Sequence, residues 1–154
     1  MTGYALTLHV LATIVWVGGM FFAYLAARPA LAELEPSLRA RVWAGIFRRF
    51  FPWVWVAIAA LLGTGVYLVY AMFESFAATP PFVGAMMGLG ILMMVLFTYL
   101  FFLPYRKLKQ AITSGDAEKM KAAMGQIRII IAVNLSLGLI VVLVAMLGTF
   151  SAAN

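Results

Sequence analysis

Cysteine is absent from this 154-residue chain, and histidine occurs only once, at His9. The lack of cysteine excludes disulfides, thiolate metal sites and iron–sulfur clusters. A single histidine also excludes a His-rich metal cluster or a bis-His haem site within one chain. Acidic residues number only five, and the long apolar stretches hold no pair of carboxylates for acid–base catalysis. With no phosphate-binding loop or dinucleotide fingerprint either, the sequence favours a non-enzymatic role and leaves enzymatic activity open.

Charge is scarce and unevenly placed. All eleven Lys and Arg residues lie in two segments, residues 28–49 and 106–128. Four stretches of roughly twenty or more residues carry no ionised side chain, and each is long enough as a helix to cross a hydrocarbon core about 30 Å thick. The chain is 66% hydrophobic with a mean hydropathy of +1.05. We therefore predict an all-α integral membrane four-helix bundle, one domain over residues 1–154, with crossings at residues 4–27, 51–72, 82–103 and 129–150.

The basic segments also predict the orientation. Cationic loops are retained on the cytoplasmic side of a membrane, so both segments should be cytosolic and both termini outside (N-out/C-out). Glu74 is the only charged side chain outside the two segments. The net charge of +6 is then a topology signal beside anionic lipid headgroups. We expect the lipid bilayer as a partner and no nucleic acid.

Each basic segment should contain a helix that leads into the next crossing. From Pro36 onward, apolar residues recur at amphipathic helical spacing against arginines, which is typical of a helix lying at the membrane interface. In the second segment, Asp116 is a candidate N-cap for a short helix over residues 117–127, and Glu118 suits the first turn.

His9 is the only group in the apolar stretches that titrates near neutral pH. Its spacing places it on a seam of mostly small residues that alternates by four and three: Ala5, His9, Ala12, Trp16, Gly19, Ala23 and Ala26. Small residues let membrane helices approach closely, so His9 should face the bundle interior, about 7.5 Å inside the outer boundary. It is either a functional group, as intramembrane ionisable residues often are, or a neutral imidazole hydrogen-bonded to a neighbouring helix.

Methionines are expected at the depth of His9. Met86 and Met87 begin the third crossing and Met146 ends the fourth. Imidazole with thioether sulfur suits Cu(I), and His with Met is also an axial pair for haem iron. The same methionines would equally serve as core packing. In the fourth crossing, Asn134 should donate a hydrogen bond to another helix.

Several runs of sequence resemble the copper resistance protein D (CopD) family. The run LHVLATIVWVGGMFFAYLAARPAL (residues 8–31) resembles the family's first helix, in which an LH pair precedes a WxGG element. The runs FRRFFPWVW (residues 47–55), MGLGILMMVLFTYLFFLPYRKLKQAI (87–112) and RIIIAVNLSLGL (128–139) look like later parts. The resemblance implies copper resistance or inner-membrane copper import, with His9, Trp16, Gly18 and Gly19 as matching positions. The chain departs from many relatives in the third helix, where a further His is replaced by Thr98, Tyr99 or Phe101.

Two functions from different classes follow, with a structural role as the third. The first is a protein of the bacterial inner membrane that captures Cu(I) through His9, Met86, Met87 and Met146, alone, as a homo-oligomer or with a periplasmic copper chaperone. The second is a haem-b redox protein in which His9 is one axial ligand, a Met or a second subunit supplies the other, and Trp16 contacts the cofactor. The chain also has a looser similarity to the four-helix haem-binding protoporphyrinogen oxidases. In the third, the chain is a membrane subunit in which His9 is only packed.

Overall fold

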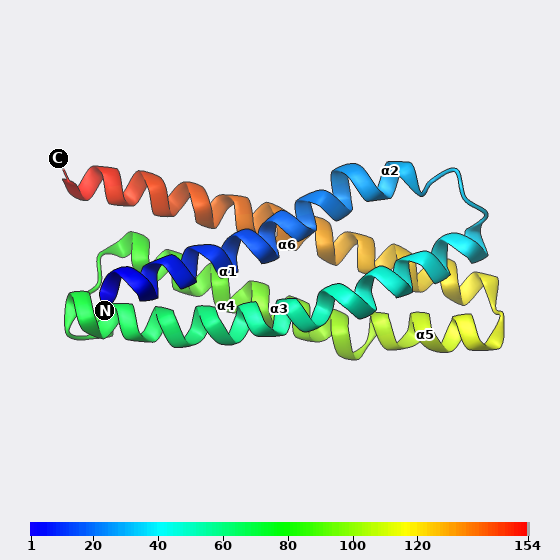
Figure 1. Cartoon of the computed structure of the whole chain (residues 1–154), viewed down its shortest axis with the longest axis horizontal. Helices are drawn as coiled ribbons and strands as arrows, with labels where there is room; N and C mark the ends of the chain where they lie inside the picture. Colours follow the sequence, from blue (N-terminus) through cyan, green and yellow to red (C-terminus); the bar gives the residue numbers. More distant parts are fainter. Residues whose placement is uncertain (154) are drawn as a thin grey trace.

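The computed structural model describes the backbone of residues 1–153 and the side chains of residues 1–151. This part of the chain contains helices, turns and no strand. The elements, in chain order, are α1 (Thr2–Phe22), η1 (Ala23–Ala27), α2 (Arg28–Ala30), α3 (Pro36–Phe73), η2 (Phe76–Ala78), α4 (Pro81–Phe102), α5 (Pro104–Ser114) and α6 (Ala117–Ala153) (Figure 1). Four helical segments are long and apolar enough to cross a membrane, which confirms the all-α four-helix membrane bundle.

The helices that lead into the membrane are continuous with the crossings themselves. The amphipathic segment and the second crossing form one 38-residue helix, α3, which accommodates Pro52 in its interior. Likewise, the short helix expected at residues 117–127 is the first part of α6. Its start agrees with the sequence, because the Lys119 backbone N–H donates to Asp116 Oδ1 at 3.0 Å. Gly115, with a φ of +70°, ends α5 in the left-handed conformation that glycine adopts without steric cost.

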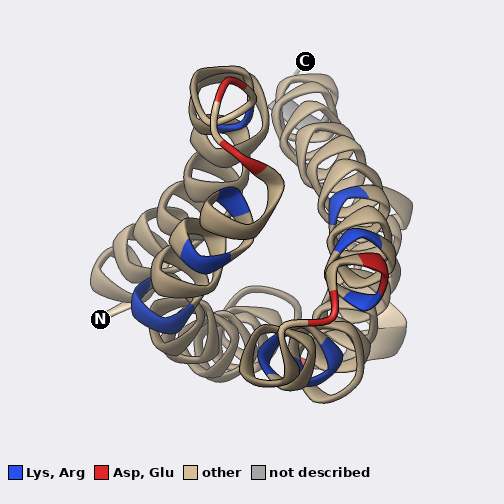
Figure 2. Ribbon diagram, turned by 90° about the vertical axis from the view of Figure 1, so that its right-hand side faces the viewer, with Lys and Arg blue, Asp and Glu red and all other residues tan. Residues whose placement is uncertain are grey.

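The four long helices associate as two pairs. α1 packs mainly on α3, and α4 packs mainly on α6, while α5 also lies against α6. Seen along the bundle, the basic residues gather where α3, α5 and α6 approach the viewer (Figure 2). We call this the basic end; both termini lie at the opposite end, the terminal end (Figure 1). The structure thus places the basic residues toward one end of the bundle, as the sequence predicted. Which side of the membrane this basic end faces stays a prediction.

Aromatic side chains fill the centre of the bundle and join the two pairs. Phe97 on α4 meets Phe51 on α3 with ring centroids 5.3 Å apart and Trp16 on α1 at 6.1 Å. Both contacts are edge-to-face, a favourable geometry for aromatic rings. α6 enters the same layer, since a Cβ built at Gly138 would lie 2.8 Å from Val17 on α1 and 3.2 Å from Met93 on α4. A side chain at this crossing would therefore have to displace its neighbours.

The orientation can be tested with single cysteines, because the natural chain has none. Gly3→Cys at the terminal end should react with a membrane-impermeant maleimide added to intact spheroplasts. Ser114→Cys at the basic end should react only after the membrane is opened. Labelling of Ser114→Cys from outside, with Gly3→Cys protected, would reverse the predicted topology.

Candidate functional site

His9 lies on α1 and faces α3. Its Nδ1 is 2.8 Å from Oγ1 of Thr64, and a Cβ built at Gly65 would lie 3.5 Å from its Cε1. The glycine beside Thr64 therefore lets the imidazole lie close to the backbone of α3. The ring is half-buried, and Thr64 is buried. His9 thus faces a neighbouring helix, as the seam of small residues predicted.

The hydrogen-bond geometry around Thr64 favours one tautomer of the neutral His9 ring. Thr64 Oγ1 donates to the Ala60 carbonyl oxygen at 2.6 Å. A hydroxyl has one hydrogen to donate, so toward His9 this oxygen acts as the acceptor. The neutral imidazole then bears its proton on Nδ1, and the lone pair of Nε2 is available. Metal-binding histidines are commonly held in this way, with the second ring nitrogen bonded to an oxygen.

Helix contacts show which other residues share the depth of His9. Val17, Met93 and Gly138 meet at one level of the bundle. Seven residues along a helix correspond to roughly 10.5 Å. Moved by this distance toward the terminal end, Val17 is replaced by the residue next to His9, Met93 by Met86, and Gly138 by the residue next to Met146. Near the terminal end, α4 and α6 are still in register, because Gly148 on α6 lies against the ring of Phe82 on α4.

The methionines at this depth differ in exposure. Met86 and Met87 on α4 are half-buried, whereas Met146 on α6 is 64% exposed. The polar contacts that the structure gives His9 run to Thr64 and, through its carbonyl oxygen, to Thr13. The ligand set of His9 with Met86, Met87 and Met146 therefore stays a prediction.

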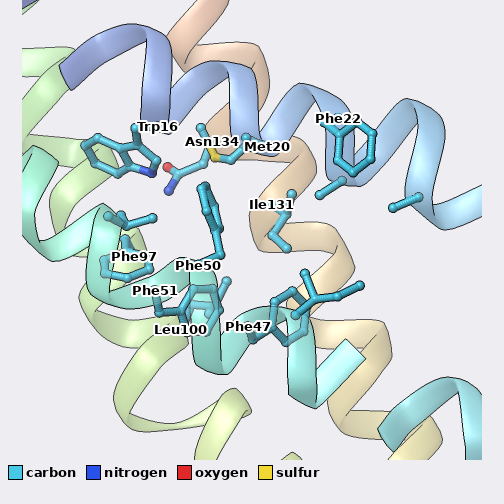
Figure 3. Close-up of a pocket in the computed structure, with 15 residues that line it drawn as sticks. Trp16, Met20, Phe22, Phe47, Phe50, Phe51, Phe97, Leu100, Ile131 and Asn134 are labelled. Carbon is cyan, nitrogen blue, oxygen red and sulfur yellow. The ribbon is translucent and has the colours of Figure 1, made fainter. Parts of the chain in front are cut away.

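Trp16 lies two turns further toward the basic end on the same face of α1. It is only 2% exposed and lines a cavity of about 130 Å³ at the centre of the bundle (Figure 3). Gly19 also lines this cavity, and a Cβ there would collide with the ring of Phe50. Gly18, by contrast, has no atom within 4 Å of its would-be Cβ in the described structure. Of the WxGG element, the tryptophan and the second glycine face inward.

The small-residue seam holds as far as Ala23, which is buried, but Ala26 is exposed. The reason is that η1 (Ala23–Ala27) is a π-helical turn, which takes more residues per turn than an α-helix. The inward position is therefore shifted by one residue, and Ala27 lines the cavity instead. A strict α-helical period could not reveal this shift.

Two buried polar residues, Asn134 and Thr64, make hydrogen bonds between helices. Asn134 donates from Nδ2 to the Met93 carbonyl oxygen at 3.2 Å, which confirms the expected interhelical hydrogen bond. Thr64 was not identified from the sequence, although a signal existed: it is the only Thr or Ser in residues 51–72 and stands between Gly63 and Gly65.

The described structure does not gather the side chains that most often hold metal ions in proteins. Among the described residues there is no group of three or more His, Cys, Asp or Glu side chains that could hold a metal ion. Apart from Glu74, the charged side chains lie in residues 28–49 and 106–128, toward the basic end (Figure 2). Near the terminal end the chain offers the imidazole of His9 and methionine sulfurs, and the carboxylate of Glu74 follows the end of α3.

One comparison with known proteins identifies a family. A profile described as copper resistance protein D matches residues 44–147, from the first part of α3 to near the end of α6. The match leaves out α1, so the likeness of the first helix, including His9, rests on the resemblance of its sequence. No curated protein and no solved structure matches the chain significantly. Since the matched span is more than half of the 154 residues, this multi-pass membrane protein belongs to the copper resistance protein D family.

Proposed function

We propose that this chain is a copper-handling protein of the bacterial inner membrane that binds Cu(I) near its terminal end through His9 and methionine thioethers. The observation that carries the proposal is the hydrogen-bond chain from His9 Nδ1 through Thr64 Oγ1 to the Ala60 carbonyl oxygen. It orients the imidazole and leaves Nε2 free to bind an ion. Membership of the family supplies the link to copper.

The donors suit the ion. Cu(I) prefers soft thioether sulfur and accepts imidazole nitrogen, and neither donor adds a charge inside the membrane. Met86 and Met146 share the depth of His9, and Met93 follows Met86 one heptad toward the basic end, where it is only 3% exposed. A captured ion would thus find a further sulfur deeper in the bundle. Copper is here the protein's cargo.

The terminal end is where a partner would deliver the ion. With the predicted orientation, that end faces the periplasm, so a periplasmic copper chaperone could approach His9 there. Met146, exposed on α6, is also placed to serve a second copy of the chain in a homo-oligomer. Both partners remain proposals that rest on the predicted topology.

The packing gives the haem-b alternative no support. The cavity beside Trp16 is about 130 Å³, below the roughly 300–1,000 Å³ of pockets for medium-sized organic ligands. His9 is not among the described residues that line it. The residues present therefore do not hold a macrocycle between His9 and Trp16 in this packing.

Thr64 gives a sharp test, because it acts on copper only through His9. Thr64→Val keeps the shape of the side chain and removes the hydroxyl. We expect Cu(I) affinity to fall about 10–100-fold, as is usual when the partner of a metal-binding histidine is lost, measured by competition with a colorimetric Cu(I) chelator. Thr98→Val is the matched control, since the Thr98 hydroxyl bonds within its own helix, to Met94 O. Equal affinity of wild type and Thr64→Val would refute the role of the Thr64 hydrogen bond.

Copper binding should also depend on pH. The ion needs the neutral imidazole, so protons compete with it and affinity should decrease as the pH is lowered. The decrease should be absent from any residual binding by His9→Ala, because thioethers do not titrate. A chelator competition between pH 5 and 8 would measure both proteins. The same pH dependence in His9→Ala would assign the effect to another group.

A further inference from the structure

A cavity at the centre of the bundle has no part in the proposed copper site. It lies where α1, α3, α4 and α6 meet and is about 130 Å³ in volume. Its apolar walls include several aromatic side chains and one carboxamide: Trp16, Phe47, Phe50, Phe51, Phe97 and Asn134 (Figure 3).

Asn134 leaves one hydrogen-bond acceptor without a partner in this cavity. The residue is 2% exposed, and its Nδ2 donates to Met93 O. Only the amide nitrogen can donate to a carbonyl, so the position of Oδ1 is determined. Among the described residues, Oδ1 has no hydrogen-bond partner, which is costly for a buried polar atom. The indole nitrogen of Trp16 is on the side of its ring that faces this carboxamide (Figure 3).

Size and polarity restrict what could occupy the cavity. A buried water requires two to four polar partners, whereas an engineered apolar cavity of about 150 Å³ stays dry and binds benzene. Here the space is similar, and the walls are apolar apart from one carboxamide and one indole N–H, so a single water bonded to these two groups would fill only part of it. The best occupant is therefore the size of an aromatic ring and carries a single hydrogen-bond donor.

The cavity is partly open, and its position indicates where a ligand would enter. Phe22, one of its lining residues, is 64% exposed on a membrane-spanning helix. Next to it, the π-helical turn η1 contributes Ala23 and Ala27 to the wall. π-helical turns are frequent at functional sites. Since Phe22 lies within a membrane span, a ligand entering beside it would come from lipid.

We propose that this cavity binds a membrane-soluble phenol, a class that includes the ring of a quinol. The ring would pack edge-to-face among the aromatic side chains, and its hydroxyl would donate to Asn134 Oδ1. The same hydroxyl oxygen could accept from the indole N–H of Trp16. This site is independent of the copper site, because His9 is not among its described lining residues.

A matched pair of small ligands tests the proposal. 4-Fluorophenol and its methyl ether, 4-fluoroanisole, have the same ring, but the ether cannot donate a hydrogen bond. Binding to the full-length protein in detergent can be measured from the ¹⁹F line width, with protein-free detergent as the blank. We expect saturable binding of the phenol, about tenfold tighter than that of the ether, as one hydrogen bond provides.

Substitutions test whether Asn134 causes the preference for the phenol over the ether. Asn134→Leu keeps the volume and removes the acceptor, so the ratio of the two affinities should fall to about one. Ser136→Ala is the control on the same helix, because Ser136 is exposed and bonds only to Ala132 O among described groups; its ratio should match wild type. Ala23→Leu adds volume to the cavity wall and should abolish binding of both ligands, which keeps the test informative if Asn134→Leu does not fold.

Three results would overturn the proposal. Equal affinity for the phenol and the ether in wild type would indicate a purely apolar cavity, such as one filled by a lipid chain. An unchanged ratio in Asn134→Leu, or unchanged binding in Ala23→Leu, would place the ligands elsewhere. Absence of saturable binding in wild type would show that the cavity takes no such ligand.

Discussion

Replacing His9 with alanine is expected to remove most of the copper that the purified protein binds, a loss in Cu(I) affinity of about 100-fold or more. His9 supplies the only imidazole in the chain, and loss of merely its hydrogen-bonding partner already costs roughly 10–100-fold at metal sites. Copper content after Cu(I) loading and desalting, measured by elemental analysis, gives the result directly.

Single methionine variants provide the comparison. Met86→Leu, Met87→Leu and Met146→Leu should each lower copper content less than His9→Ala, because neighbouring thioethers can replace one another. Leucine preserves apolar volume, so these variants should fold like wild type. If His9→Ala shows an unchanged melting temperature and wild-type copper content, His9 is a packed histidine and the assignment is wrong.

Gly19→Leu should destabilise the packing of α1 on α3. A Cβ at this position collides with the ring of Phe50, and the larger side chain must displace that ring from the α1–α3 interface. Overpacking of this kind typically costs about 1–3 kcal/mol. Thermal unfolding in detergent, followed by circular dichroism, should show a clearly lower midpoint for the variant.

Gly18→Leu is the matched control, since it makes the same change one residue away. Gly18 is exposed, and its would-be Cβ meets open space within the described structure. Its unfolding midpoint should remain close to that of wild type. Equal midpoints for Gly19→Leu and Gly18→Leu would show that Phe50 moves aside freely and that the interface is loosely packed.

The sequence was sufficient to predict the membrane architecture, because its physical causes are local. Uncharged stretches of sufficient length predict crossings, and the confinement of basic residues predicts one charged end. The spacing of His9, Trp16 and Gly19 predicted the inward face of α1, and Asn134 was expected to bond another helix. Each of these features depends on one helix and its period.

The features that sequence did not predict depend on two helices at once. The pairing of α1 with α3 brings Phe50 against Gly19, and small residues on every crossing left other pairings open. Thr64 gained its role only when α3 brought it to His9. The cavity depends on four helices and on the π-helical turn that moves Ala27 inward, which no fixed helical period encodes.

The most direct measurement of the copper site is the X-ray absorption spectrum of the Cu(I)-loaded protein. The proposed site predicts a Cu(I) edge with sulfur scatterers together with the outer-shell pattern of one imidazole, and loss of that imidazole pattern in any copper retained by His9→Ala. A wild-type spectrum without an imidazole contribution, or a protein that retains no copper after loading, would contradict copper binding by His9.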